Sequence, residues 1–436
     1  MLIRFSLENW MSFRDRATLS IIASRERQHG ECIPRLSKYQ TGILPVTAIF
    51  GPNASGKTGL FSALDFVRSL VVDGTSHSDE PIPVQPFLPD APDGTRPTHF
   101  ILELLIDEII YEFRGSLNGR SVLEEQLTVI TSTSEKVMYR RRKGKPNFHK
   151  SLARDRFLRF VFNSTRDNQL FLTHSVLLNA DRFRPVYDWF KNTLRLISPD
   201  FLFTSPERFP ASGNPLHETM NERLRELDIG IERLEVEDIP SERLSLSGQE
   251  LARLQADAGE SRLVRLQGSG RNLVLGSRDG MPYAGKLVAV RREADGTEIR
   301  RDLDRESSGV QRIAALLPAI IDLSSGDRKS AVHVIDDMDR SLHTLLTVDL
   351  VRQYLARCSD TTRSQLLFSA HDLLLMDQHL LRRDEMWVTE RRDPGTGSSS
   401  LIAFSEYGDI RYDKDIRKSY LKGHLGGIPR PGSRHS

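Results

Sequence analysis

The sequence predicts an α/β fold whose core is formed by both ends of the chain and is split by a mainly helical insertion. Near the N-terminus, short apolar runs alternate with polar residues at the two-residue period of half-buried strands. Between residues 154 and 237 the apolar positions follow the period of amphipathic helices. After residue 286, strand-like and helix-like runs alternate again, as in a sheet covered by helices.

Residues 1–139 are expected to form the first part of the core, with an antiparallel subsheet. Ile3, Phe5 and Leu7 alternate with polar residues, which indicates a strand rather than a secretory leader. A hairpin is expected to turn at Asp107, where two apolar runs meet. The predicted strands are residues 2–10, 17–22, 42–50, 100–106, 108–114 and 123–131, and the predicted helix is 60–71.

Residues 140–272 are expected to form the insertion, and residues 273–436 the second part of the core. Within the insertion, Val186–Leu196 and Glu218–Leu227 have amphipathic helical spacing, whereas residues 241–272 form a polar connection. In the last part, strands are expected at 286–292 and 297–303 around an Asp295–Gly296 turn.

Composition excludes several classes of protein. Hydrophobic residues make up 38% of the 436 residues, enough for a sizeable core, and the formal net charge of +2 favours no particular partner. Two cysteines, Cys32 and Cys358, exclude a disulfide framework or a zinc knuckle. No apolar stretch is long enough to span a bilayer. We therefore expect a soluble, cytoplasmic protein.

A glycine-rich loop between the strand at 46–50 and the following helix is the strongest chemical signal. It matches G-x-x-x-x-G-K-[ST] in the required strand–loop–helix context. Its backbone N–H groups and the helix N-terminus are suited to nucleotide phosphates; its lysine is suited to the β- and γ-phosphates of ATP, and its threonine to Mg²⁺. A chance turn is the alternative. The residues are Gly51, Pro52, Asn53, Ala54, Ser55, Gly56, Lys57 and Thr58.

A second apolar strand, residues 331–335, ends in two carboxylates. We expect Asp336 to hold Mg²⁺ through water, and Asp337 to orient or deprotonate the water that attacks ATP. Standing alone, the motif would indicate only a strand that ends in a solvated acidic turn. Together with the phosphate loop it indicates the second half of a nucleotide site.

Ser308 and Gly309 begin a further apolar helix. Ser308 lies 28 residues before Asp336. A small turn at a helix N-terminus binds anions. The order of phosphate loop, Ser-Gly helix start, Asp-Asp strand and histidine resembles the ABC-type ATPases, including their SMC and OLD-like branches. In that group the Ser-Gly turn of one protomer binds the γ-phosphate held by the other, which implies a homodimer, or a higher homo-oligomer, that forms through the ATP sites.

The same resemblance assigns further roles. It implies that His371, at the end of the apolar strand that begins at Gln365, is the switch histidine on the γ-phosphate. It also makes Gln85 a candidate loop glutamine that senses Mg²⁺. Both residues have a purely structural alternative. The family usually has Glu where this chain has Asp337, and the shorter side chain predicts slow hydrolysis.

Other segments resemble the bacterial AAA-type ATPases of abortive-infection operons, relatives of OLD proteins without their nuclease domain. This resemblance implies an ATPase that acts as a sensor or scaffold in defence against phage and controls a separately encoded effector, typically a nuclease. The segments are residues 9–13, 100–114, 123–126, 227–231, 380–384, 420–423 and 426–429.

Two other functions remain open. An ATP-gated nucleic-acid clamp of the DNA-repair type would use the basic run Arg140–Lys145, with Phe148 nearby, although such a run is also typical of a solvated hairpin tip. A small-molecule kinase is disfavoured by the Ser-Gly turn and His371. We also expect no membrane contact.

Overall fold

The computed structural model describes residues 1–87, 96–142, 145–198, 215–227, 229–239, 262–265, 272–278, 281–324, 330–391, 397–407 and 415–427. Chain contacts divide these into two compact units. The first unit contains Met1–Leu196, Arg328–Met338 and Leu355–Ser436, and the second contains Ile197–Asp327 and Asp339–Tyr354.

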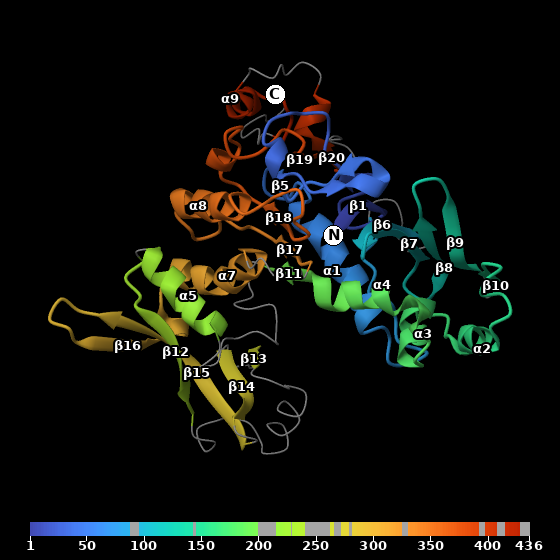
Figure 1. The fold of residues 1–436 in the computed structure, drawn as a ribbon, viewed down its shortest axis with the longest axis horizontal. Coiled ribbons are helices and arrows are strands. Elements are labelled where there is room, and N and C mark those ends of the chain that lie inside the picture. Colours follow the sequence, from blue (N-terminus) through green and yellow to red (C-terminus); the bar gives the residue numbers. More distant parts are fainter. Residues whose placement is uncertain are drawn as a thin grey trace, which may run out of the picture. The chain divides into compact units, whose positions relative to one another are not determined.

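The first unit contains a seven-stranded antiparallel sheet and a six-stranded sheet with a parallel centre (Figure 1). The seven-stranded sheet runs in the order β10 (Lys145–Phe148), β9 (Glu135–Arg142), β8 (Val122–Ile130), β7 (Ile109–Leu117), β6 (Thr98–Ile106), β1 (Leu2–Glu8) and β2 (Ala17–Ser20). The six-stranded sheet runs in the order β11 (Leu194–Ile197), β17 (Val332–Ile335), β18 (Gln365–Ser369), β5 (Val46–Phe50), β19 (Met386–Arg391) and β20 (Ser399–Ala403). A short ribbon pairs β3 (Arg35–Leu36) with β4 (Thr41–Gly42).

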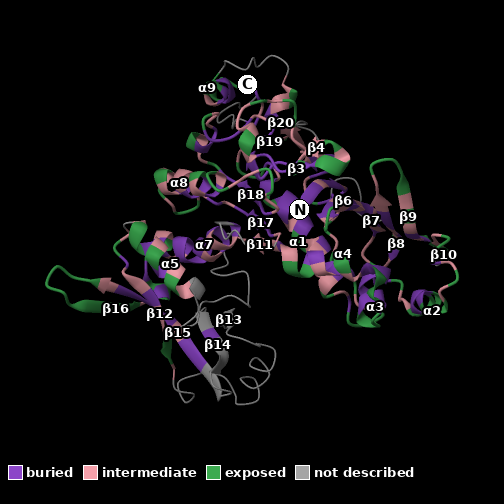
Figure 2. Ribbon diagram, viewed as in Figure 1, coloured by how far each residue is buried: buried purple, intermediate pink, exposed green. Residues whose placement is uncertain are grey.

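Helix α1 (Lys57–Val72) joins the two sheets of the first unit through one apolar core. Trp10 packs on Phe66 of this helix with ring centroids 4.8 Å apart, and Phe66 packs on Phe100 of β6 at 5.6 Å. The buried side chain of Gln365 adds a polar link, because its amide bonds both backbone groups of Leu2 at 2.6 and 2.9 Å. Figure 2 shows this centre of the unit as buried.

The remaining helices of the first unit are short. They are α2 (Arg156–Ser164), α3 (Phe171–Leu177), α4 (Arg184–Asp188) and α9 (Ile416–Leu421).

The second unit has its own sheet and its own core. The sheet runs in the order β12 (Arg233–Asp238), β15 (Met281–Arg292), β14 (Asn272–Arg278) and β13 (Arg262–Arg265), and β16 (Glu298–Asp302) pairs with β15. Among the described residues of this unit, the helices are α5 (Pro215–Glu226), α7 (Ser308–Ser324) and α8 (Thr344–Leu355). Buried apolar residues of α5, α7, β12 and β15 pack together, which gives this unit a hydrophobic cluster separate from that of the first.

The mixed α/β fold with an antiparallel subsheet confirms the predicted fold class. The hairpin predicted at Asp107 is also confirmed: Asp107 and Glu108 both have positive φ, the backbone of the tight turns that join twisted antiparallel strands. The strands predicted at 286–292 and 297–303 correspond to β15 and β16. The helix predicted at 218–227 corresponds to α5.

The amphipathic run Val186–Leu196 is not one helix. It contains the end of α4, a π-helical turn (Trp189–Thr193) and the start of β11. Leu194 and Ile197 are buried in β11, because this segment adds an edge strand to the six-stranded sheet. Pairing with a distant strand overrides the local helical period there.

The range 140–272, predicted as a mainly helical insertion, contains both helices and strands. Helices α2 to α5 lie between residues 156 and 226, but β10 to β14 also fall in this range or begin in it. The predicted domain limits after residues 139 and 272 stay predictions; one falls inside β9 and the other at the start of β14. Most of the polar connection predicted over 241–272 lies outside the described residues.

Candidate active site

Three neighbouring strands bring most of the predicted site residues to one edge of the six-stranded sheet. Strands β17, β18 and β5 are adjacent and parallel. Asp336 follows β17, His371 follows β18 by two residues, and Gly51 follows β5. Since the carboxyl ends of parallel strands meet at one edge, residues far apart in sequence converge in the position where open α/β sheets bind ligands.

The phosphate loop has the backbone that its glycines permit. Gly51 has φ of 148° and Gly56 has φ of 115°, a region that other residues rarely adopt. A Cβ on Gly51 would lie 2.5 Å from the Thr389 carbonyl oxygen, so glycine is also required by space. Gly56 caps α1 and leaves the first N–H groups of the helix open to an anion.

Lys57 is buried at the start of α1. Its Nζ donates to the carbonyl oxygens of Gly51 at 2.7 Å and Pro52 at 3.2 Å, and it lies 3.5 Å from Nδ1 of His371. These contacts hold the ammonium inside the loop, where the phosphates of a nucleotide would replace the carbonyls as its partners. Thr58, the next residue, is exposed.

Ser369, the last residue of β18, contacts both aspartates that follow β17, one through its carboxylate and the other through its backbone. The hydroxyl of Ser369 donates to Oδ1 of the buried Asp336 at 2.5 Å, and it accepts from the backbone N–H of Asp337 at 2.8 Å. Asp337 has φ of 45°, a left-handed conformation that Asp tolerates better than most residues. The chain turns sharply here, and this turn directs the two carboxylates to separate partners.

Asp337 contacts the histidine that the sequence singled out. Its Oδ1 lies 3.2 Å from Nε2 of His371, while Lys57 approaches Nδ1 of the same ring. The Lys57 ammonium and the Asp337 carboxylate thus lie at opposite nitrogens of one imidazole ring. Lys57, His371 and Asp337 therefore form one continuous chain of polar contacts.

The donor set fits Mg²⁺ bound together with a nucleotide. Mg²⁺ in such sites takes one or two protein oxygens and completes its shell with water and phosphate oxygens. The Thr58 hydroxyl and the Asp336 carboxylate would supply those protein oxygens. In the described part of the chain, no group of three or more His, Cys, Asp or Glu side chains is placed to hold a metal by itself.

Two residues of β19 brace the phosphate loop, and the sequence patterns did not single them out. The hydroxyl of Thr389 lies 2.5 Å from that of Ser55 and donates to the Phe50 carbonyl at 3.3 Å. Arg391 Nε donates to the Ala54 carbonyl at 3.0 Å. These contacts depend on β19 pairing with β5, a partnership between segments more than 300 residues apart that no local pattern reveals.

Gln85 approaches this edge through its backbone. Its carbonyl accepts from the Met11 N–H at 2.6 Å, and the Met11 sulfur lies 3.1 Å from the Ser62 hydroxyl on α1. The Gln85 side chain is exposed. Its predicted role toward Mg²⁺ therefore remains a prediction.

Ser308 and Gly309 begin α7 in the second unit. Ser308 is exposed, and a Cβ on Gly309 would lie 2.8 Å from the Ser341 carbonyl oxygen, so the turn packs closely against the loop before α8. The preceding Glu306 is buried and accepts from Arg291 of β15 at 2.8 Å. This ion pair fixes the turn from which α7 starts.

The motif Leu380–Asp384 has a structural role in the first unit. Buried Arg382 forms two hydrogen bonds to Asp384, at 2.8 and 2.7 Å, and also donates to the Gln28 carbonyl. Burial raises the pKa of the neighbouring Glu385 carboxyl to about 8. The backbone carbonyl of Glu385 accepts from Ala48 of β5 at 2.7 Å, which ties this network to the strand that leads into the phosphate loop.

The C-terminal glycine motif also contacts β19. A Cβ on Gly426 would overlap the Glu390 carboxylate, and the Gly427 N–H donates to Glu390 at 3.2 Å. Tyr420 donates to the Gly427 carbonyl, and burial followed by the nearby Glu390 charge raises its pKa to about 12. Residues 428 and 429 of this motif lie outside the described residues.

Comparison with known families decides the membership of the chain. The family described as "AAA domain, putative AbiEii toxin, Type IV TA system" matches residues 46–377, more than half of the chain. The chain belongs to this family. The match covers the phosphate loop, both aspartates after β17, the Ser-Gly turn and His371.

This member of the AAA-domain family also has distant structural likenesses. An SMC head domain from Thermotoga maritima is 13% identical with a TM-score of 0.35, over 92% of this chain and 98% of that one. An SMC head bound to the C-terminal winged-helix domain of ScpA is 11% identical with a TM-score of 0.40, over 96% and 99%. At such values the likeness adds nothing to the topology described above. Among curated proteins, no sequence matches this chain.

Family membership makes the chain an AAA-type protein with a nucleotide-binding ATPase fold. The candidate residues for phosphate and Mg²⁺ binding in the first unit are gathered at the edge formed by β17, β18 and β5. Among the described helices, none is long and apolar enough to cross a lipid bilayer.

Proposed function

We propose that this protein binds ATP with Mg²⁺ and hydrolyses it slowly. Lys57 and the loop N–H groups hold the phosphates, Thr58 and Asp336 hold the metal ion, and Asp337 positions the attacking water while His371 contacts the γ-phosphate. The contact chain Lys57–His371–Asp337 carries this proposal, because it couples the phosphate-binding cation to the candidate base. Asp337 is one methylene shorter than Glu, which is the reason for slow turnover.

We further propose that two copies pair head to tail and complete each other's site. The exposed Ser308 and the Gly309 turn of one copy would then contact the γ-phosphate held by the other. A helix start that carries small residues and no cation of its own supports this role, since it offers N–H groups to an anion that another element must hold.

The biological role that we propose is that of a sensor or scaffold in cytoplasmic defence against phage. ATP-dependent pairing would control a separately encoded effector, such as a nuclease or another toxin. The description of the family, which names a toxin and a toxin–antitoxin system, supports this setting. An ATP-gated nucleic-acid clamp is the alternative, favoured by the cationic surface described in the next subsection.

A mixing experiment tests the shared site. Lys57→Ala removes the phosphate cation, and Ser308→Arg places a bulky charge at the start of α7. Each variant alone should lose nearly all ATP turnover. In a mixture, one site of every heterodimer pairs the intact loop of the Ser308→Arg copy with the intact turn of the Lys57→Ala copy, so turnover should reappear. Phosphate release is measured against total protein concentration, and Lys191→Ala, an exposed lysine on the π-helical turn, serves as the control.

The outcomes separate the parts of the proposal. Recovery in the mixture supports the shared site. Full turnover by Ser308→Arg alone, with no dependence on concentration, would show that each copy acts by itself. ATP binding by Lys57→Ala equal to that of the parent protein would reject the nucleotide site.

A further inference from the structure

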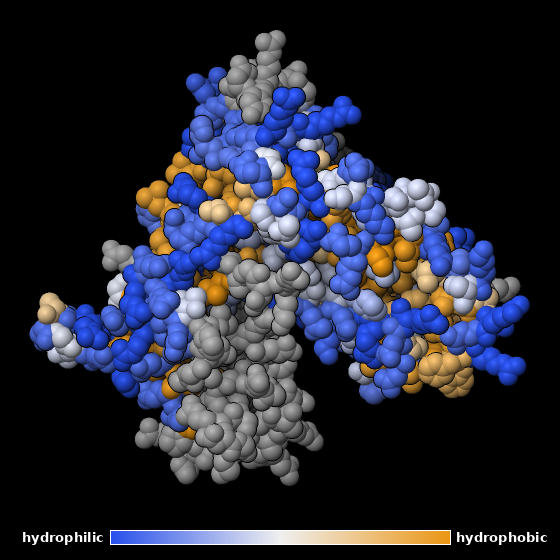
Figure 3. Space-filling view, in the orientation of Figure 1, coloured by the Kyte–Doolittle hydropathy of each residue, from blue (hydrophilic) through white to orange (hydrophobic). Residues whose placement is uncertain are grey.

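One surface of the first unit is not explained by the ATP site. It is formed by β10, the turn after it and α2, and we call its exposed residues the arm surface: Lys150, Arg154, Arg156, Phe157, Arg159 and Phe160. Figure 2 shows much of α2 as exposed, and Figure 3 shows apolar side chains beside hydrophilic ones over this region.

Two arginines of the basic run predicted to contact nucleic acid make contacts within the fold, whereas Arg142 is exposed. Arg141 is buried and donates to the carbonyls of Gln169 at 2.5 Å and Arg166 at 2.8 Å. Arg140 donates to Glu124 on the neighbouring strand at 2.7 Å. Residues 143 and 144 lie outside the described residues. The alternation of side chains along β9 turns Arg141 inward, which the charge run alone did not indicate.

The arm surface has the cations that this run does not provide. No side-chain hydrogen bond or ion pair is found for Arg154, Arg156 or Arg159 within the described part of the chain. The single carboxylate among residues 145–164 is Asp155, and its Oδ1 accepts from the Leu158 N–H as the cap of α2. Positive charge is therefore concentrated here although the whole chain is nearly neutral.

Two aromatic side chains of α2 face outward. Phe157 is 48% exposed and Phe160 is 62% exposed, and their spacing of three residues places them on one face of the helix. The adjoining face packs through Leu158, Val161 and Phe162, and the Phe162 ring lies 5.9 Å from that of Phe148. The helix is thus anchored without Phe157 and Phe160, and these rings are available to a ligand.

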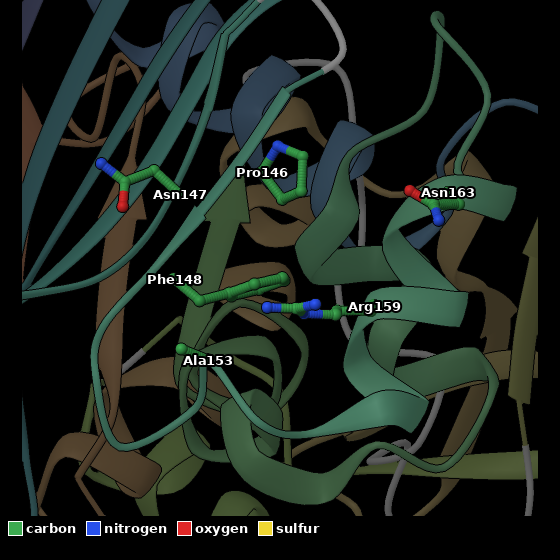
Figure 4. Close-up of a pocket in the computed structure, with 6 residues that line it drawn as sticks. All are labelled: Pro146, Asn147, Phe148, Ala153, Arg159 and Asn163. Carbon is green, nitrogen blue, oxygen red and sulfur yellow. The ribbon is translucent and has the colours of Figure 1, made fainter.

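A pocket of about 370 Å³ lies between β10 and α2. Its lining combines the Arg159 guanidinium with the amides of Asn147 and Asn163 and with one ring, Phe148. Figure 4 shows side chains from the strand on one side and from the helix on the other. Amides offer both donors and acceptors, as a nucleobase edge requires, and the volume lies in the range of small-ligand sites.

We propose that the arm surface binds single-stranded nucleic acid. The arginines contact phosphates, bases stack on Phe157 and Phe160, and one base enters the pocket beside Arg159. Exposed rings interleaved with cations match this ligand, because every base has a face for stacking and every linkage has a charge. In a duplex the bases are already stacked and paired, so the rings and the pocket would find no partner. The proposal does not depend on ATP hydrolysis.

The test compares two double variants with one control. Arg156→Ala with Arg159→Ala removes two phosphate contacts, and Phe157→Ser with Phe160→Ser removes both rings. The control is Arg25→Ala with Arg27→Ala, which removes two exposed arginines elsewhere in the first unit. Binding of fluorescent oligo(dT), oligo(U) and a duplex of equal length is measured by anisotropy over a series of salt concentrations, with and without ATP. ATP turnover and thermal melting verify that each variant is folded.

Each variant has a distinct expected signature. The parent protein and the control should bind the single strands more tightly than the duplex. The arginine variant should lose affinity and lower the slope of log K against log salt by about 1.4, at about 0.7 per contact. The serine variant should lose about fivefold or more in affinity with the slope unchanged.

Other results would overturn the proposal. These are equal binding by all variants, equal affinity for duplex and single strand, or no binding by the parent protein. Capture of an acidic partner protein on this face, without oligonucleotide binding, would instead make it a protein interface. Preference for oligo(dT) or for oligo(U) decides between DNA and RNA.

Discussion

The N-termini of α1 and α7 have similar backbones but different neighbouring groups. Both helices begin after small residues, and in both a glycine lies against a carbonyl oxygen: Gly51 against Thr389 and Gly309 against Ser341. Only the start of α1 has its own cation, Lys57, and neighbouring groups that can act on a phosphate, Asp337 and His371. The start of α7 exposes Ser308 and is preceded by the buried Glu306, which pairs with the half-buried Arg291.

This difference suggests that the start of α1 holds the phosphates, whereas the start of α7 completes the site of another copy. The start of α1 supplies charge, N–H groups and a candidate base, so substitutions there should affect binding and chemistry. The start of α7 supplies N–H groups and a hydroxyl, so substitutions there should affect turnover and spare binding to a single copy. The four predictions below test this division, from the largest expected effect to the smallest.

Gly51→Ala should weaken ATP binding and lower turnover by about 10²-fold or more, because a displacement of about 1 Å in such a site can cost that much in rate. The new Cβ would lie 2.5 Å from the Thr389 carbonyl oxygen at a φ of 148°, so the loop must shift. Gly30→Ala is the matched control, because its Cβ would meet nothing within 4 Å. Fluorescent-nucleotide titration measures the affinity of both variants. Equal affinities would contradict the role described for the phosphate loop before α1.

Asp337→Asn should lower ATP turnover by about 10²-fold while binding is kept, because an amide cannot accept the proton of the attacking water. Asp337→Glu should raise turnover, since it moves the carboxylate one methylene further out, although the φ of 45° costs the longer residue about 1 kcal/mol. Single-turnover phosphate release separates chemistry from binding. Turnover unchanged or lower in Asp337→Glu would remove the explanation for slow hydrolysis.

Gly309→Ala should lower turnover by about tenfold and leave ATP binding to the monomer unchanged. The substitution shifts the start of α7, and with it Ser308, by less than the displacement of about 1 Å that is expected for Gly51→Ala, so the loss of rate is smaller. The added Cβ would lie 2.8 Å from the Ser341 carbonyl oxygen. Mass measurement with a slowly hydrolysed ATP analogue should show weaker pairing. An equal loss of ATP binding to the monomer would show that the start of α7 also contributes to nucleotide binding within one copy.

Arg291→Ala should have the smallest effect on turnover, below about tenfold, together with a destabilisation of about 1–3 kcal/mol, because the buried Glu306 loses the partner that it has in the 32% exposed Arg291. Arg291→Lys should recover part of the stability. Arg305→Ala is the control, because that side chain is 76% exposed and lies 4.0 Å from Asp302. Chemical denaturation and ATP turnover are measured together; an unchanged midpoint would show that the ion pair does not hold the α7 turn.

The sequence by itself determined the local structural motifs of this protein. A glycine-rich loop between a buried strand and a helix predicts its own conformation, since each part depends on neighbours along the chain. The hairpin at Asp107 and helix α5 were predicted for the same reason. The motif order also indicated that Asp336, Asp337 and His371 belong with Lys57, and the parallel pairing of β17, β18 and β5 places all four at one edge.

Only the tertiary structure decided which distant residues contact those motifs. Thr389 and Arg391 brace the phosphate loop because β19 pairs with β5, and Leu194 lies in a strand because β11 extends the sheet beside β17. Arg141 turns inward to carbonyls on another segment, and exposed cations beside exposed rings are found on α2. Periodicity reports which face of an element is apolar, but long-range pairing selects what that face meets, and no local run of residues encodes the choice.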